Sequence, residues 1–179
     1  QAEEMLRSDE LEAALDYIAE NKQIWEVILT GGDPLSLSSS KLEAIFAKLD
    51  QIEHVKIIRI HTRIPIADPS KVTADFLPVL KRKKPVYIIL HCNSHLELHK
   101  DSVKLINNLA DNGNPLMSQS VLLKGVNNTA SQLEKLFRRL VELRVRPYYL
   151  HHPDLARGTS HFRVGLAEGR ELSAQLRKT

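Results

Sequence analysis

WEVILT, at residues 25–30, is a short and nearly continuous apolar run that leads directly into Gly31-Gly32. A run of this length bounded by glycine is typical of a strand buried in a parallel sheet. Four further apolar runs follow it, at residues 55–60 (VKIIRI), 86–90 (VYIIL), 115–123 (PLMSQSVLL) and 146–151 (RPYYLH). The chain is therefore expected to contain five strands.

Amphipathic segments alternate with these runs and predict helices at residues 8–21, 39–50, 73–82, 100–112, 129–143 and 166–177. Ser8 is a candidate N-cap, Thr129 and Gln132 form a plausible capping box, and Gly113 is a candidate helix stop. Pro78 leaves the start of the helix at 73–82 open. Strict alternation indicates an α/β fold of βαβ units on a parallel sheet, either doubly wound or the wall of a barrel.

The bulk composition is that of an ordinary globular domain: 179 residues, 42% hydrophobic, 26% charged and a formal net charge of +3. No apolar run is long enough to span a bilayer, and no secretory signal is visible. The polar start, QAEEMLRSDELEAA, looks like an interior cut through a longer protein. The single cysteine, Cys92, excludes an intrachain disulfide, favours a cytoplasmic setting and cannot by itself hold an iron–sulfur cluster.

The densest basic cluster is Lys81-Arg82-Lys83-Lys84. A nucleic-acid surface would want more basic residues with aromatic side chains among them, and aromatics make up only 5% of the chain. The cluster is therefore interpreted as a solvated helix end, and no nucleic-acid partner is expected.

Ligands of parallel α/β folds bind at the carboxyl ends of the strands, so the polar residues there are the candidate site. Gly31-Gly32-Asp33 follows the first strand, where paired glycines either let the backbone approach a ligand or simply form a tight turn. Gln119 lies in an apolar strand, where its amide either contacts a ligand in a barrel lumen or bonds to backbone. The remaining strand ends carry His61-Thr62-Arg63, His91-Cys92-Asn93 and His151-His152-Pro153-Asp154.

Histidines are numerous at these ends, but none completes a metal site. His91, His95 and His99 recur every four residues in a segment interpreted as loop, without the cysteines or carboxylates of a zinc site. His151 and His152 are adjacent in a strand, so only one of them is expected to face a lumen. Asp154 either binds a substrate cation or caps a turn.

Several segments together resemble the lysine 2,3-aminomutase family of radical S-adenosylmethionine enzymes. The matching stretches are ILTGGDPL (28–35), HVKIIRIHTRIPI (54–66), PLMSQSVLLKGVN (115–127) and VRPYYLHHPDLARGTSHFR (145–163), which cover nearly the whole chain. The resemblance implies a partial (β/α) barrel, residues 1–179 forming a single domain that corresponds to strands two to six of a family barrel. It also implies an aminomutase that interconverts L-α-lysine and β-lysine with S-adenosylmethionine, a [4Fe-4S] cluster and pyridoxal 5′-phosphate.

By the same resemblance, Gly31, Gly32 and Asp33 correspond to the motif that holds the methionyl amino group of S-adenosylmethionine. His91 and Gln119 correspond to residues beside the same ligand. Asp154 corresponds to one of two carboxylates that pair with the distal ammonium of lysine, a feature that relatives acting on glutamate are expected to lack.

The family's CxxxCxxC loop is expected to lie before Gln1, and the lysine that binds pyridoxal phosphate after Thr179. No catalytic residue and no metal ligand is therefore assigned within this chain, which is expected to be an inactive fragment. Two alternatives remain: the paralogue that makes β-lysine for modifying translation elongation factor P, and a non-catalytic α/β module that binds a ligand or partner. An incomplete barrel has two open sheet edges, so marginal stability or association, for instance as a homo-oligomer, is also expected.

Overall fold

The computed structural model describes residues 7–178 and contains five strands, β1 (Glu26–Leu29), β2 (Ile57–Thr62), β3 (Val86–His91), β4 (Leu116–Val121) and β5 (Val145–His151). All neighbouring strands are parallel, and their order in the sheet is their order in the sequence. A doubly wound sheet would reverse this order part-way. The strand order therefore decides for the wall of a barrel.

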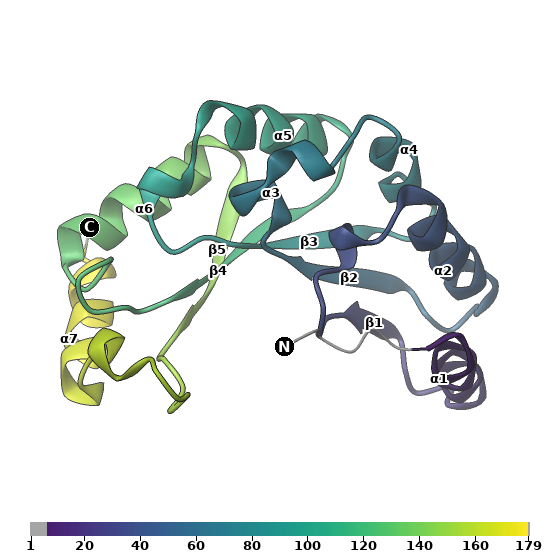
Figure 1. The fold of residues 1–179 in the computed structure, drawn as a ribbon, viewed down its shortest axis with the longest axis horizontal. Helices are drawn as coiled ribbons and strands as arrows, with labels where there is room; N and C mark the ends of the chain where they lie inside the picture. The colour runs from purple at the N-terminus through teal and green to yellow at the C-terminus, as the bar shows by residue number, and fades with distance from the viewer. Residues whose placement is uncertain (1–6, 179) are drawn as a thin grey trace.

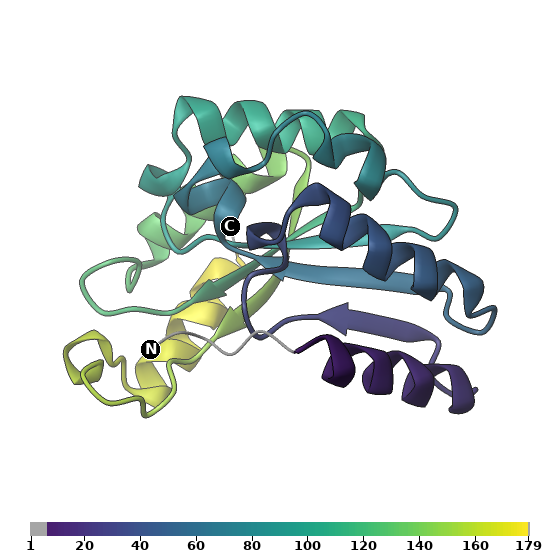
Figure 2. The same cartoon turned by 45° about the vertical axis from the view of Figure 1, so that its right-hand side comes forward.

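The helices all lie on the outer side of the curved sheet, as Figures 1 and 2 show. They are α1 (Ser8–Glu20), α2 (Ser39–Gln51), α3 (Ile64–Ala67), α4 (Phe76–Leu80), α5 (Lys100–Asp111), α6 (Ala130–Glu142) and α7 (Leu166–Leu176). Short 3-10 turns η1 (Pro34–Ser36), η2 (Pro69–Lys71), η3 (His95–Glu97) and η4 (Ser160–Phe162) follow strands or join elements. The predicted partial (β/α) barrel is thus confirmed. None of the helices in residues 7–178 is long and apolar enough to cross a membrane.

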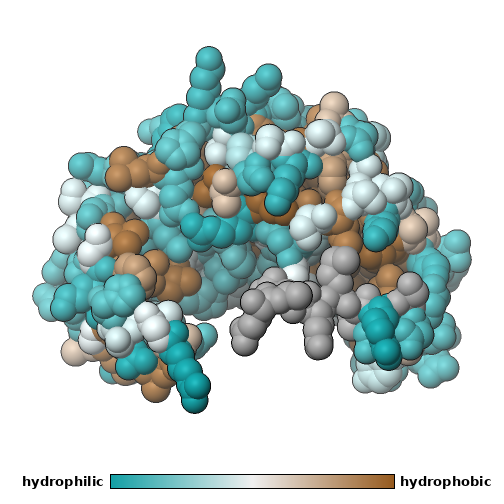
Figure 3. All heavy atoms as spheres, viewed as in Figure 1, coloured by the Kyte–Doolittle hydropathy of each residue, from teal (hydrophilic) through white to brown (hydrophobic). Residues whose placement is uncertain are grey.

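Each strand sends alternate side chains outward, where the helices cover them. On β2 the outward residues Ile58, Ile60 and Thr62 are buried, and Ile57, Arg59 and His61 between them are less so. One core cluster joins the sheet to the helices α1 to α6, and a smaller one around Leu133 and Leu172 lies between α6 and α7. The inner, concave face carries the remaining strand residues. In Figure 3 this underside is hollowed, and hydrophilic residues are prominent along its roof.

Two local predictions at the helix termini were right and two were wrong. Thr129 caps α6, its hydroxyl oxygen accepting from the Gln132 N–H at 3.2 Å. Gly113, at φ +91°, ends α5 as expected. Ser8, in contrast, is the first helical residue, and the backbone N–H of Arg7 before it donates to the Glu10 carboxylate at 2.8 Å. The helix predicted at 73–82 contracts to Phe76–Leu80 around Pro78.

The basic cluster at 81–84 is less solvated than expected. The Arg82 guanidinium bridges Glu43 and Asp50, at 2.5 and 2.6 Å. The Lys84 ammonium donates to the carbonyls of Leu49 and Ile52, at the C-terminal end of α2. The cluster was expected to interact with the C-terminus of its own helix, α4. Lys84 interacts instead with the C-terminus of α2.

Candidate functional site

The loop after β1 places Gly31 and Gly32 at the carboxyl edge of the sheet. Gly31 has φ +104°, a conformation that other residues adopt only with strain. Within residues 7–178, no heavy atom lies within 4 Å of a Cβ built on either glycine, so this part of the structure leaves open space beside the backbone. The loop therefore has the room that a small-molecule ligand needs to approach main-chain N–H and C=O groups.

The Asp33 carboxylate anchors this loop to the end of β2. Its Oδ1 accepts hydrogen bonds from the Leu35 N–H at 3.1 Å and the Thr62 hydroxyl at 2.6 Å. Its Oδ2 accepts from the N–H groups of Arg63 at 2.6 Å and Ile64 at 3.2 Å. An ionised carboxylate has about four acceptor sites, and four protein donors already use them. Ligand contacts at this motif are therefore available from the glycine backbone rather than from the Asp33 side chain.

His61, His91 and Gln119 come together on the concave face, near the ends of β2, β3 and β4. His61 Nδ1 is 3.0 Å from Gln119 Oε1, and the rings of His61 and His91 meet edge to face with centroids 5.9 Å apart. The Nε2 atoms of both histidines are buried, and no hydrogen-bond partner for them exists among the described residues. Buried polar atoms are nearly always paired in folded proteins, so these two atoms mark a place that suits a ligand.

Burial also sets the charge state of the two rings. Loss of solvation lowers the pKa of His61, although its hydrogen bond to Gln119 acts in the opposite direction. Loss of solvation lowers the pKa of His91 too, and the neighbouring His61 adds to this effect. Both rings are therefore neutral at neutral pH and can each offer a nitrogen lone pair.

Arg59 lies deeper in the hollow, on the concave face of the sheet. Its Nη2 is 2.6 Å from Glu26 Oε1 on β1, and its guanidinium carbon lies 5.6 Å from the ring centroid of Tyr148 on β5. Burial alone would lower the pKa of Arg59, but the Glu26 carboxylate raises it above its ordinary value. The contacts of Arg59 with Glu26 and Tyr148 thus link β1 to β5 across the hollow.

The β5 strand adds aromatic side chains to the same face. Tyr149 is stacked on His151 with ring centroids 5.0 Å apart, and its hydroxyl donates to the Tyr148 hydroxyl at 3.2 Å. The Nε2 of His152 instead bonds to the Val164 carbonyl at 2.8 Å, on the side of α7. Only one of the two adjacent histidines thus faces the hollow, as expected. The inward-facing set is hereafter the concave-face cluster: Glu26, Arg59, His61, His91, Gln119, Tyr148, Tyr149 and His151.

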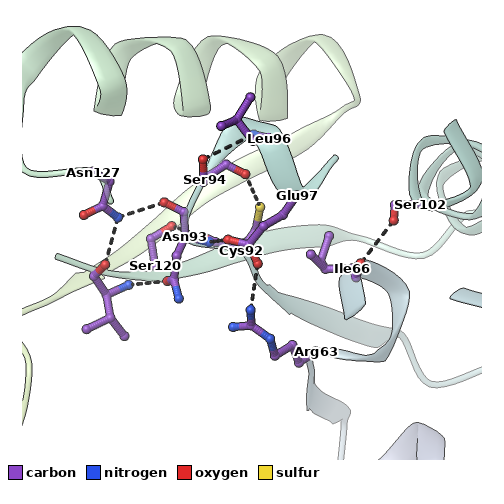
Figure 4. A network of polar contacts seen from close by, with 11 residues as sticks. Arg63, Ile66, Cys92, Asn93, Ser94, Leu96, Glu97, Ser102, Ser120 and Asn127 are labelled. Atoms are coloured by element: carbon purple, nitrogen blue, oxygen red, sulfur yellow. Dashed lines mark hydrogen bonds and ion pairs between the residues drawn. The ribbon is translucent and has the colours of Figure 1, made fainter. Parts of the chain in front are cut away.

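A polar network ties the ends of β3 and β4 together behind the cluster (Figure 4). The Asn93 side-chain oxygen accepts from the Val121 N–H at 2.8 Å, and the Asn127 amide donates to the carbonyls of Asn93 and Val121. Glu97 accepts from the Asn93 N–H at 2.9 Å and pairs with Arg63 at 2.8 Å. These bonds fix the strand ends that carry His91 and Gln119.

Asp154 lies in the exposed loop after β5. Within residues 7–178 its carboxylate makes no hydrogen bond and no ion pair. It neither caps a helix nor closes a turn, which were the structural explanations for a carboxylate at this position.

Cys92 is fully buried behind β3, and burial raises the pKa of its thiol to about 12. Among the described residues, no group of three histidine, cysteine or acidic side chains could hold a metal ion. The thiol set of these 179 residues therefore does not fit a [4Fe-4S] cluster.

Comparison with known proteins identifies the sequence relatives, although no protein-family model matches the chain. The L-lysine 2,3-aminomutase of Methanococcus maripaludis is 43% identical over 168 residues, which are 94% of this chain and 39% of that protein. The enzyme of the same name from Clostridium subterminale is 40% identical over 177 residues, or 99% of this chain and 42% of that protein. The chain belongs to the lysine 2,3-aminomutase family. It spans about two fifths of the length of these curated relatives.

Members of the family differ in the amino acid that their names give. The glutamate 2,3-aminomutase of Clostridioides difficile is 38% identical to this chain over 167 residues, or 93% of this chain and 40% of that protein. Family membership alone therefore does not decide between these two names.

Solved structures similar to this aminomutase homologue show its fold. Native anSMEcpe with bound AdoMet matches with a TM-score of 0.72 and 13% identity, covering 99% of this chain and 52% of that one. A radical SAM methyltransferase from Sphaerobacter thermophilus matches with a TM-score of 0.61 and 15% identity, covering 95% of this chain and 53% of that one. The five strands are thus part of a barrel of the radical SAM type.

The structure groups some of the predicted site residues and separates others. Gln119 and His91 both belong to the concave-face cluster, and Gly31 and Gly32 lie at the same carboxyl edge of the sheet. Asp154, in the loop after β5, makes no hydrogen bond or ion pair with any of them. Sequence reasoning missed Arg59, Tyr148 and Tyr149 as inward-facing residues, and treated His61 only as one polar residue at a strand end. The alternation of β2 was the available signal, because Ile58, Ile60 and Thr62 are the buried set.

Proposed function

We propose that this chain is the S-adenosylmethionine- and lysine-binding part of an L-lysine 2,3-aminomutase, with its five strands as strands two to six of the barrel. The observation that carries the proposal is the pair of buried Nε2 atoms of His61 and His91, which have no hydrogen-bond partner within residues 7–178. They lie beside Gln119, at the edge of the sheet where the described residues leave open space around Gly31 and Gly32. A cytoplasmic setting accompanies it, because the single cysteine is a free thiol.

The residues present fit S-adenosylmethionine, whose role in the family is to supply the hydrogen-abstracting radical. Gly31 and Gly32 would offer backbone groups to the methionyl end. The Gln119 side-chain nitrogen would donate a hydrogen bond, and the His91 Nε2 would accept one. The cysteines that would hold a [4Fe-4S] cluster are not among these residues, and the concave-face cluster contains no lysine that could bind pyridoxal phosphate. The described site therefore fits neither of these two cofactors. We assign no step to either.

The charge of Asp154 favours one of the two amino acids as the substrate. An exposed carboxylate that has no partner among the described residues is suited to the distal ammonium of lysine, and it would repel the side-chain carboxylate of glutamate. Lysine is therefore favoured over glutamate as the amino acid bound at this site.

The test is binding of S-adenosylmethionine to the chain by isothermal titration calorimetry. The variant Gly32→Val fills the open space beside the loop without a contact in the protein, so it should bind at least about tenfold more weakly, a loss of about 1.4 kcal/mol. The matched control is Gly165→Val, at a glycine with extended backbone where an added Cβ would make an ordinary contact with the Glu168 Cβ at 4.0 Å, and there the affinity should not change. Equal affinities of the two variants, or no binding by the unchanged chain, would refute the proposal.

The substrate assignment needs its own measurement. Binding of lysine and of glutamate to the chain saturated with S-adenosylmethionine should favour lysine. Asp154→Asn should reduce the lysine affinity by about tenfold, the loss expected for one charge-assisted hydrogen bond, and leave S-adenosylmethionine binding unchanged. A preference for glutamate would assign the chain to the other named activity in the family.

A further inference from the structure

His61 reaches across a whole strand to touch two candidate ligand contacts. In the sheet it lies opposite Ile89 of β3, whereas Gln119 belongs to β4 and lies opposite His91. The side chains of His61 and Gln119 nevertheless meet over β3 at 3.0 Å, and the His61 ring also packs edge-on against the His91 ring. One residue thus contacts both of the side chains assigned to S-adenosylmethionine.

The chemistry of this contact determines which atoms remain free. An amide oxygen only accepts hydrogen bonds, so the proton of the neutral His61 ring is on Nδ1. The Gln119 side-chain nitrogen makes no hydrogen bond within the described part of the chain and remains a donor. The His61 Nε2 remains a buried acceptor without a partner.

We propose that His61 is a positioning residue, which holds the Gln119 side chain in the orientation that presents its amide nitrogen to the bound ligand. The inference rests on the proposed function, because it takes Gln119 as a contact of S-adenosylmethionine. Without the His61 N–H, the Gln119 amide is free to turn about its last torsion and to present its oxygen instead. A ligand acceptor would then meet the wrong atom.

Two substitutions separate positioning from simple filling of space. His61→Leu fills the volume but removes the donor, whereas His61→Asn is smaller but keeps an N–H group close to the position of Nδ1. We expect His61→Leu to weaken S-adenosylmethionine binding by about threefold to tenfold, the range of one neutral hydrogen bond. We expect His61→Asn to restore most of the affinity. If Leu binds as well as the unchanged chain and Asn does not, His61 only fills space and the proposal is wrong.

A double-mutant cycle shows whether the effect passes through Gln119. In a Gln119→Leu background, His61→Leu should cause no further loss of affinity, because the orientation it maintains no longer matters. Additive losses would overturn the proposal. His54→Leu is the matched control, since His54 also makes one side-chain hydrogen bond, to the Ile18 carbonyl at 2.9 Å.

A measurement without ligand separates failure of this inference from failure of the proposed function. The side-chain amide resonances of Gln119 in the nitrogen-15 spectrum of the chain should shift in His61→Leu, return toward their original position in His61→Asn and stay unchanged in His54→Leu. Unchanged resonances in His61→Leu would overturn the positioning role even if the ligand binds. A shift in a chain that binds no S-adenosylmethionine would refute the proposed function and, with it, the ligand-presenting role, and leave only the orientation of Gln119.

Discussion

Asp33 is the residue on which the hydrogen bonds of the candidate site converge. Three backbone N–H groups and the buried Thr62 hydroxyl all donate to its carboxylate. The resemblance implies that the motif ending in Asp33 holds the methionyl amino group, and the structure shows the Asp33 side chain anchoring the loop of that motif. It holds the glycine backbone where a ligand would need it.

Replacing Asp33 with alanine should therefore destabilise the protein even without ligand. The loss of hydrogen bonds to a charged acceptor should lower the free energy of unfolding by about 3 kcal/mol. Urea denaturation followed by circular dichroism measures the difference. Asp154→Ala is the control, because its exposed carboxylate has no partner in the described residues and should change stability by less than about 0.5 kcal/mol. Equal effects of the two variants would contradict the anchoring role.

Cys92 should be unreactive as long as the chain is folded. Its thiol pKa is raised from 9.0 to about 12, so at pH 8 its thiolate fraction is about a thousandfold smaller than that of an unfolded chain. Labelling with iodoacetamide, followed by mass spectrometry, should be slow in buffer and fast in urea. The sign for stability follows: deprotonation above about pH 9 favours the unfolded state, so stability falls as pH rises through that value. Rapid labelling of chain that keeps its circular dichroism would show that burial does not protect the thiol.

At the scale of elements, the end of α5 is a sharp test of local geometry. The N–H groups of Gly113 and Asn114 bond back to the carbonyls of Ala110 and Leu109, which is the Schellman pattern, and Gly113 has φ +91°. Gly113→Ala should cost about 1 kcal/mol, because alanine is strained in this conformation. Gly165→Ala, at the N-cap of α7 with φ −64° and an ordinary 4.0 Å contact to the Glu168 Cβ, should cost less than Gly113→Ala, because alanine adopts this conformation without strain. Thermal unfolding of the two variants compares them, and a Gly113→Ala protein as stable as its control would count against the assignment.

The elements could be predicted from the sequence because each has a clear periodicity and clear boundary residues. The short helix α3, IPIA, was missed, since four residues are too few to show a helical period. The second strand was placed at 55–60, but it runs from Ile57 to Thr62. The N–H groups of Lys56 and Ile57 both donate to the single carbonyl of Trp25, and regular pairing with β1 begins only at Ile57. That shift of two residues moved His61 from the expected strand end into the sheet.

The candidate site was less predictable than the fold, for a physical reason. Gln119 could be chosen from sequence because an amide in an apolar strand needs partners. The contact of His61 with Gln119 joins residues 58 positions apart and crosses a strand between them. Such a pairing depends on strand order and register, and neither of these can be read from a local pattern.

At the scale of the whole molecule, the described sheet has two open edges. Within residues 7–178, β1 pairs only with β2 and β5 only with β4. Unpaired strand edges readily bind other strands, and Ile28 on β1 is 45% exposed. The chain on its own should therefore self-associate as its concentration rises.

Sedimentation velocity over a hundredfold range of concentration measures this association. Ile28→Lys places a charge on the β1 edge and should shift the distribution toward monomer. Tyr17→Lys is a control of similar exposure on α1, outside the sheet, and should leave the distribution unchanged. If the unchanged chain is monomeric at all concentrations, its unpaired strand edges do not mediate self-association.

The irregularity between β4 and β5 has a consequence for recombination between relatives. At Ser118 and Gln119 the register slips by one, so that Tyr148 and Tyr149 both face inward and every later residue of β5 changes sides. The residues of β5 that face inward therefore have even numbers before the slip and odd numbers after it. A chimera joined between residues 145 and 149 with one residue too few would turn His151 toward the helices and His152 toward the hollow. Crossover points outside this interval leave the register slip intact, so the same residues of β5 continue to face inward.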